Sequence, residues 1–246
     1  MRVASACLTH DMPARCTVVS VSVSMRVRQM FGALYAYVRS APGTFVWLAI
    51  LLVTTLIIRS VPADTAQDIL ERRSTNLHYL SVSPVRVLVS SALWIGGSGW
   101  FGYLVLYNIF HVPAERWLGT RRWLGVVVIA HGGATFLSEG VLYWAIHHGY
   151  APHSAVHTLD YGVSYALAGV EGVLTYLIAR PWRFLYVGAL LLYYIVGVLQ
   201  ARDFTSVGHL SAALIGLACY PIARGRPGQW DPAASARMLR QRLRRA

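Results

Sequence analysis

The chain has 246 residues, of which 56% are hydrophobic and 13% are charged. Soluble globular proteins carry a charged fraction of about 25%, so this composition excludes a disordered chain and argues against an ordinary soluble enzyme. All 22 basic residues are arginines, and with 10 acidic residues they give a net charge of +12. Such a charge suits nucleic acid or an anionic membrane surface, and the hydrophobicity favours the membrane. We therefore expect the lipid bilayer as a partner and no nucleic acid.

Six apolar segments reach or approach the ~20 residues that a helix needs to cross a bilayer. Their continuous runs of Leu, Ala and Gly favour helices over strands. The first lies between Arg39 and Arg59, and the others span residues 87–110, 123–146, 161–178, 184–199 and 205–222. The fifth is short, so we expect it to include Trp182 and Gln200. The predicted fold is an all-α, polytopic membrane bundle of six transmembrane helices.

These segments divide the chain into three parts. Residues 1–38 form an N-terminal cytoplasmic segment that need not be structured, residues 39–223 form the membrane domain, and residues 224–246 form a basic cytoplasmic tail. No signal peptide is expected, because the first long apolar run begins too late and is too long. Met25 and Met30 are alternative translation starts.

The distribution of arginines predicts the topology. With a cytoplasmic N-terminus, 17 arginines fall on inner segments and five on outer segments. The positive-inside rule therefore places both termini in the cytoplasm of a multi-pass protein of the plasma membrane. In the tail, Asp231-Pro232 is typical of a helix start, and the arginines that follow alternate with Met238, Leu239 and Leu243. Two interpretations stay open for this tail: a helix on anionic lipid, or a solvated basic segment.

Metal-binding residue types are few or poorly spaced. The three cysteines form neither a Cys-x-x-Cys pair nor a disulfide framework: Cys7, Cys16 and Cys219. Four histidines share one loop but lack the fixed helical spacing of a zinc site: His147, His148, His153 and His157. We interpret them as solvated loop residues and expect no metal and no cofactor.

Ionisable side chains within membrane spans are costly and are candidates for function. Five lie in these segments or at their ends: His131, Glu139, Asp160, Glu171 and His209. Ser164 joins them, because it follows Asp160 by four residues just as His209 follows Thr205. With 1.5 Å of rise per residue, Ser164 and His209 lie at matching depths of ~6 Å on two parallel helices. A serine nucleophile and its general base need this arrangement.

Plainer explanations stand beside this one. A membrane serine usually bonds a carbonyl one turn back. Asp160 fits the N-cap of the fourth helix, and His131 and Glu171 fit a buried structural pair. Glu139 could orient His209 or bond a neighbouring helix.

The order of these features resembles the rhomboid family of intramembrane serine proteases over about residues 45–223. Gly162-Val163-Ser164-Tyr165 stands where the family has Gly-x-Ser-Gly, and Gly208-His209 with the small residues after it stands where the family has its histidine. Val85-Arg86 takes the place of Trp-Arg, and Glu115-Arg116-Trp117-Leu118-Gly119 supplies the acid and Leu-Gly after the second helix. The chain looks like a divergent, actinobacterial-type member.

The departures concern the oxyanion site. The family's His-x-x-x-Asn in the second helix falls on Gly99 and Tyr103, and Tyr165 replaces a glycine and is expected to crowd the turn that a substrate approaches. One oxyanion donor is worth ~3 kcal/mol, so the loss weakens a protease without abolishing it.

The resemblance implies a protease that cleaves transmembrane segments near their outer ends. Ser164 would be the nucleophile and His209 the base, with support from Gly162, Tyr165 and Asp160. The alternative is a weak or inactive rhomboid-like protein that binds client transmembrane helices. A third hypothesis, a transporter with a proton relay through His131, Glu139 and Glu171, lacks any visible inverted repeat.

Overall fold

The computed structural model describes residues 27–96 and 99–244. The secondary structure of this part is helical, apart from one isolated bridge between Ile178 and Trp230, which confirms the predicted all-α fold. The chain divides between Ser40 and Ala41 into two units. In the first, residues 27–39 form a helix. The predictions for residues 1–26, which include Cys7, Cys16 and Met25, concern residues outside the described part of the chain.

Five apolar helices of the second unit agree with the predicted segments. Helices α2 (Pro42–Ser60), α8 (Thr120–His147) and α10 (Trp182–Ala201) are long and apolar enough to cross a membrane. Helices α9 (Gly162–Leu174) and α11 (Phe204–Ala218) are apolar but shorter. Helix α10 includes Trp182 and Gln200, as predicted for the fifth segment.

The second predicted segment, 87–110, is not one helix. Helix α5 (Pro84–Ser91) ends early, and a new helical run begins at Trp100. This run comprises α6 (Trp100–Leu106), a π-helical turn η1 (Tyr107–His111) and α7 (Val112–Leu118). The sequence between the two parts contains Gly96-Gly97-Ser98-Gly99, and Gly99 has a φ of 75°, which glycine adopts without strain. The apolar helical run therefore begins at Trp100 and ends at Leu118, further along the chain at both ends than the predicted 87–110.

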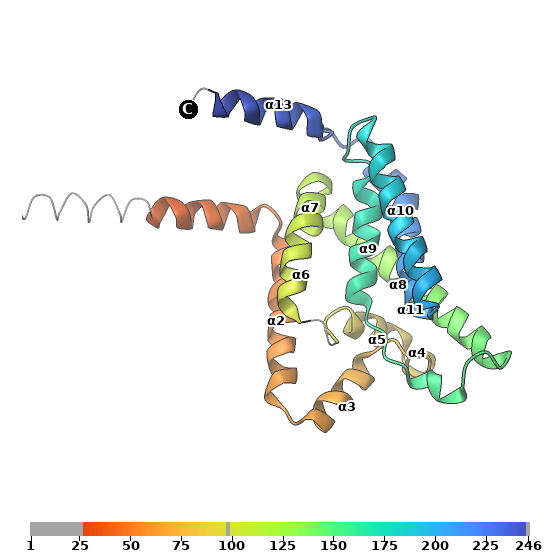
Figure 1. Ribbon diagram of the computed structural model, residues 1–246. Helices are drawn as coiled ribbons and strands as arrows, with labels where there is room; N and C mark the ends of the chain where they lie inside the picture. The colour runs from red at the N-terminus through yellow and green to blue at the C-terminus, as the bar shows by residue number, and fades with distance from the viewer. Residues whose placement is uncertain (1–26, 97–98, 245–246) are drawn as a thin grey trace, which may run out of the picture. The chain divides into compact units, whose positions relative to one another are not determined.

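The connections gather at two ends of the second unit (Figure 1). Helices α3 (Ala63–Arg73), α4 (Leu77–Val82) and α5 lie at one end, which we call the α5 end. The other end, the α7 end, holds the C-terminus of α7 and the start of α13 (Pro232–Leu243). The short helices η2 (His153–His157) and α12 (Tyr220–Ala223) follow α8 and α11.

Small residues bring α9 and α11 together at backbone distance. A methyl group on Gly216 would overlap the carbonyl oxygen of Gly169, and one on Gly172 would overlap that of Ala213. Gly208 lies against the ring of Tyr165 in the same way. The small residues after His209 therefore pack tightly against α9, and the contact places the first turns of the two parallel helices side by side.

A buried carboxylate fixes the start of α2. Glu115 of α7 accepts hydrogen bonds from the Gly43 and Thr44 amides at 2.8 and 2.7 Å, and from the Thr44 and Thr120 hydroxyls at 2.7 Å. No side chain of α2 itself caps this helix, so Glu115 satisfies amides that would otherwise lack partners. The acid of the family motif thus holds α2 against α7.

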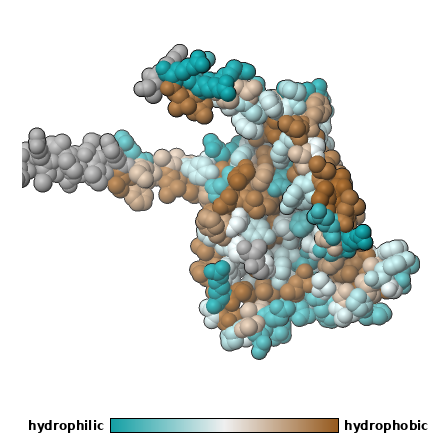
Figure 2. All heavy atoms as spheres, viewed as in Figure 1, coloured by the Kyte–Doolittle hydropathy of each residue, from teal (hydrophilic) through white to brown (hydrophobic). Residues whose placement is uncertain are grey.

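The exterior is rich in hydrophobic side chains (Figure 2). Helix α10 is the extreme case, because Leu190 is its only buried residue. Soluble proteins seldom expose such continuous apolar surface, whereas a helix that faces lipid does so without cost. The fold therefore suits a membrane protein with its core around α8, α9 and α11.

Candidate active site

Ser164 occupies a distinctive place in the most enclosed helix. Every residue of α9 from Gly162 to Leu174 is buried except Ser164, which is partly exposed. Its hydroxyl donates a hydrogen bond to the carbonyl oxygen of Tyr161 at 3.3 Å, one turn back. Ser164 is therefore the point at which the central helix of the bundle opens to its surroundings.

His209 lies one turn into α11, where two tyrosine rings hold its imidazole. The edge of Tyr165 meets it at a centroid distance of 5.1 Å and an interplanar angle of 72°. Tyr194 of α10 lies nearly parallel to it at 6.2 Å and 14°. Rings on two different helices thus restrict the orientation of the imidazole.

Ser164 and His209 line one cavity. It has a volume of about 1030 Å³, and its walls come from α6, α9, α10 and α11. No hydrogen bond joins the two side chains in the described part of the chain, because the serine hydroxyl is bonded to Tyr161. A rotation of the serine side chain away from that carbonyl would free its hydroxyl for the imidazole. Catalytic hydrogen bonds are often formed only when substrate is bound.

The two positions that replace the family's oxyanion residues also lie in this cavity. Gly99 and Tyr103 both contribute to its wall on the side of α6. Neither supplies the amide or imidazole donor found in the family. Helix α9 has no side-chain cap, so the backbone amides of its first turn are the donors closest in sequence to Ser164.

Gly162 lies where α9 packs against α8. A methyl group at this position would overlap the imidazole of His131 on α8. Nε2 of His131 is bonded to the carbonyl oxygen of Leu88 at 2.9 Å and lies 3.4 Å from the Ser91 hydroxyl. The glycine therefore allows α9 to pack on α8, next to the break after α5.

Tyr165 does not crowd the cavity. Its side chain is fully buried between α9 and α11, packed with Ala134, Ala168 and Ala212, and does not line the cavity wall. The larger side chain fits because Gly208 leaves room for its ring. The expectation of a blocked approach to Ser164 is corrected: Tyr165 supports His209 from behind.

Asp160 does not cap α9. The helix has Tyr161 at its N-cap position and no side-chain cap, while the Asp160 carboxylate accepts a hydrogen bond from the Thr75 hydroxyl at 3.4 Å. The Asp160 amide donates to the Ser74 hydroxyl at 2.6 Å, and its carbonyl accepts from the Thr75 amide at 2.9 Å. Burial raises the pKa of this carboxyl to about 6.

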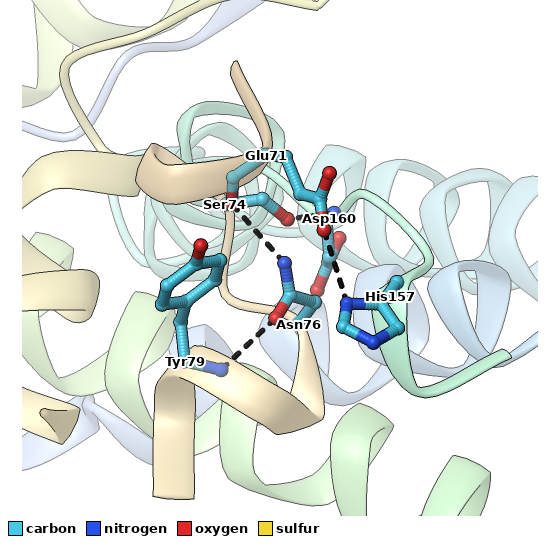
Figure 3. A network of polar contacts seen from close by, with 6 residues as sticks. All are labelled: Glu71, Ser74, Asn76, Tyr79, His157 and Asp160. Atoms are coloured by element: carbon cyan, nitrogen blue, oxygen red, sulfur yellow. Dashed lines mark hydrogen bonds and ion pairs between the residues drawn. The ribbon is translucent and has the colours of Figure 1, made fainter. Parts of the chain in front are cut away.

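Asp160 belongs to a polar network at the α5 end (Figure 3). Figure 3 shows the segment after α3 lying against the loop that leads into α9, with Glu71 and Ser74 facing His157 and Asp160. Glu71 and His157 approach to 3.0 Å, and Asn76 bonds the Glu71 carbonyl and the Tyr79 amide. The connection between α2 and α5 thus holds the chain at the start of the serine helix.

The remaining buried ionisable residues do not pair with one another. His131 and Glu171 are not paired, because His131 bonds Leu88 whereas Glu171 accepts a hydrogen bond from the Tyr194 hydroxyl at 2.5 Å. Glu139 is buried, and neither of its carboxyl oxygens has a hydrogen-bond partner in the described residues, so nothing links it to His209. Glu139 is therefore not joined to His209 as a third member of a catalytic triad.

Comparison with known proteins agrees with this geometry. A sequence model of the family described as rhomboid-like protein matches residues 36–229. The chain belongs to the rhomboid-like family. No curated protein and no solved structure matches it. The match covers the whole helical unit from α2 to α12, so this rhomboid-like protein is a membrane protein, and its actinobacterial character stays a prediction.

Sequence reasoning missed the tyrosines of α10 in this rhomboid-like protein. Tyr186 donates to the backbone oxygen of Glu171 at 2.9 Å, and Tyr194 contacts both Glu171 and His209. Their spacing of eight residues places them on one face of a helix, which is a usable signal, but only the fold shows what that face meets. His111 was missed as well. It is buried and accepts a hydrogen bond from the Trp123 indole at 3.1 Å.

No group of three metal-binding side chains occurs among the residues that the structure describes. The loop histidines of the rhomboid-like protein are exposed and separate: His147 and His148 face backbone oxygens of α8, whereas His157 faces Glu71.

Proposed function

We propose that this rhomboid-like protein is an intramembrane serine protease that cleaves transmembrane segments near their outer ends. One observation carries the proposal: Ser164, the only residue of α9 that is not buried, shares a cavity with His209. Serine and imidazole on separate, tightly packed helices are the groups that nucleophilic catalysis requires. The α5 end then faces outward, and both termini lie in the cytoplasm of a plasma-membrane protein.

In the proposed reaction the imidazole of His209 accepts the proton of the Ser164 hydroxyl while its oxygen attacks a peptide carbonyl carbon. The backbone amides at the start of α9 stabilise the negative oxygen that develops. The protonated imidazole then gives its proton to the leaving amine, and water hydrolyses the ester that remains. With Gly99 and Tyr103 in place of the usual donors, we expect a slow enzyme.

The test is cleavage of a single-span substrate by the full chain reconstituted in vesicles. Wild type should cleave it, and Ser164→Ala and His209→Ala should lower the rate at least 1,000-fold, as loss of a nucleophile or base does. Ser211→Ala is the matched control, because this serine is on α11 but does not line the cavity. Equal cleavage by wild type and Ser164→Ala would exclude the proposal.

A rhomboid-like protein that binds client helices without cleaving them is the second candidate. The hydrogen bond from Ser164 to Tyr161 and the absence of a side-chain donor at Gly99 favour it. It predicts that clients co-purify equally with wild type and Ser164→Ala. It also predicts no labelling by a fluorophosphonate, a reagent that modifies activated serines. Strong labelling that Ser164→Ala abolishes would decide for the protease.

A further inference from the structure

Glu171 is an acid without a countercharge in the wall of the cavity. It lies on α9, seven residues after Ser164, so that the two side chains share one face of the helix ~10 Å apart. Among the described residues that line the cavity, Glu171 is the only acid, and none is an arginine. Its neighbours in the wall are apolar or aromatic, including Leu167, Tyr186 and Leu190.

One oxygen of this carboxyl group remains available to a ligand. The Tyr194 hydroxyl bonds Oε2, whereas Oε1 has no partner in the described chain and is not sealed off from the cavity. The residue as a whole is only 8% exposed. A partner of opposite charge stabilises a carboxyl group in such apolar surroundings, and acids inside membranes commonly mark binding sites.

We propose that Glu171 forms a subsite that binds a lysine or arginine side chain of the transmembrane segment in the cavity. The proposal rests on the cavity's taking such a segment, whether or not it is cleaved. The apolar wall accommodates the hydrocarbon stem of the basic residue, and Oε1 receives its charged end. The ~10 Å between Ser164 and Glu171 places this residue about three positions from the serine in an extended segment, or about seven in a helical one.

The experiment measures binding rather than cleavage, on full-length Ser164→Ala protein in vesicles. Two fluorescent single-span peptides differ only at the chosen position, Lys or Leu. The Lys peptide should bind about tenfold tighter, which is the usual effect of a hydrogen bond to a charged group. Glu171→Gln should abolish this preference, and Glu171→Lys should favour a peptide with Glu instead.

Tyr194→Phe is the matched control, because it removes the hydrogen bond between α10 and Glu171 but keeps the acid. It should retain the preference for Lys. If the Ser164→Ala protein with Glu171 intact binds both peptides equally, or binds neither, the proposed subsite is wrong. A preference lost in Tyr194→Phe as fully as in Glu171→Gln would reduce Glu171 to a link between helices. Wild-type cleavage is measured separately, so a failed subsite leaves the protease proposal standing.

Helix α13 supports an independent inference. Asp231 caps it through the Ala233 and Ala234 amides at 2.8 and 3.3 Å. The segment before it is fixed to the α7 end: Trp230 exchanges main-chain hydrogen bonds with Leu177 and Ala179 at 2.7 and 3.0 Å. From this point α13 runs across the direction of α9 rather than along it (Figure 1).

The helix has two unlike sides. Ala236, Leu239 and Leu243 are exposed and recur at helical spacing, which makes an apolar stripe. Four exposed arginines lie in this helix or at its C-cap: Arg237, Arg240, Arg242 and Arg244. The nearest acid is Asp231 at the N-cap, which approaches Arg237 to 4.0 Å. In Figure 2 the lower side of α13 is hydrophobic and the upper side is hydrophilic.

We infer that α13 lies in the surface of the cytoplasmic leaflet and binds anionic lipid headgroups. The apolar stripe enters the boundary between headgroups and acyl chains, while the arginines meet lipid phosphates. Charge complementarity selects anionic lipid, because basic residues near a membrane surface are attracted to its negative headgroups. Of the two interpretations left open for the basic tail, the two unlike sides of α13 favour the helix on anionic lipid.

The test uses full-length protein with Cys7, Cys16 and Cys219 replaced by Ala, in nanodiscs. An environment-sensitive dye is placed at Leu239→Cys, on the stripe, or at Gln241→Cys, on the opposite side. In discs with phosphatidylglycerol the dye at 239 should report an apolar environment and the dye at 241 should not. Replacing the four arginines by Gln should remove this signal. Equal signals from the dyes at 239 and 241 would overturn the inference. So would a signal at 239 that is as apolar in discs of phosphatidylcholine alone as in discs with phosphatidylglycerol.

Discussion

Gly162 packs directly against the imidazole of His131, and this contact joins the helix that carries Ser164 to the long helix α8. Because the ring is itself bonded to Leu88, it cannot easily withdraw. We expect Gly162→Ala to destabilise the protein by about 1–3 kcal/mol, as other overpacked cores are. Thermal unfolding in detergent measures this. Gly140→Ala is the control, since no atom lies within 4 Å of the added methyl group and the helix gains up to ~1 kcal/mol.

Glu115 holds the start of α2 through four hydrogen bonds. Glu115→Gln keeps the size of the side chain but replaces one acceptor oxygen by an amide group that donates. That amide group would then face the buried amides and hydroxyls that donate to Glu115. We expect a loss of about 2–3 kcal/mol in the free energy of unfolding. Glu71→Gln, at an exposed pair with His157, should cost under ~1 kcal/mol. Comparable losses in both variants would contradict the role given to Glu115.

Asp160 should make stability depend on pH. Burial raises its pKa to about 6 from the ordinary value of 3.8, so the folded protein holds this proton more tightly than the unfolded chain does. The resulting stabilisation is complete below about pH 4 and is lost as the pH rises through about 6. The loss should reach up to ~3 kcal/mol. Unfolding of Asp160→Asn should lack this decline, and an identical pH profile in both proteins would refute the explanation.

The contact of Gly216 with Gly169 sets the distance between α9 and α11. Gly216→Ala should force the helices apart and cost about 1–3 kcal/mol. It should also reduce fluorophosphonate labelling of Ser164, because the serine and the histidine would separate. Gly188→Ala on α10 adds its methyl group where no atom lies within 4 Å, and Gly188 does not line the cavity, so its labelling should match wild type. Unchanged labelling in Gly216→Ala would mean that the helix spacing does not govern the site.

Several features of this fold follow from the sequence because they depend on local pattern. Continuous apolar runs predicted α2, α8 and α10, and their composition favoured helices over strands. The shift of the second helix to Trp100–Leu118 could not be judged from hydrophobicity, since residues 87–95 are apolar as well. Only the Gly-Gly-Ser-Gly stretch at 96–99 marks the break, and its effect depends on how α5 packs.

For the site, the positions of Ser164 and His209 within their helices predicted that the two side chains would lie at the same depth on parallel helices. The tertiary structure decided which side chains surround them. Tyr165 turns toward Gly208 and away from the cavity, Asp160 bonds the Ser74-Thr75 segment and not its own helix, and Glu171 meets Tyr194. These partners are 23 to 86 residues apart in the sequence. Helical repeat and hydropathy are properties of neighbouring residues, whereas a buried polar group takes its partner from whatever helix the packing brings beside it.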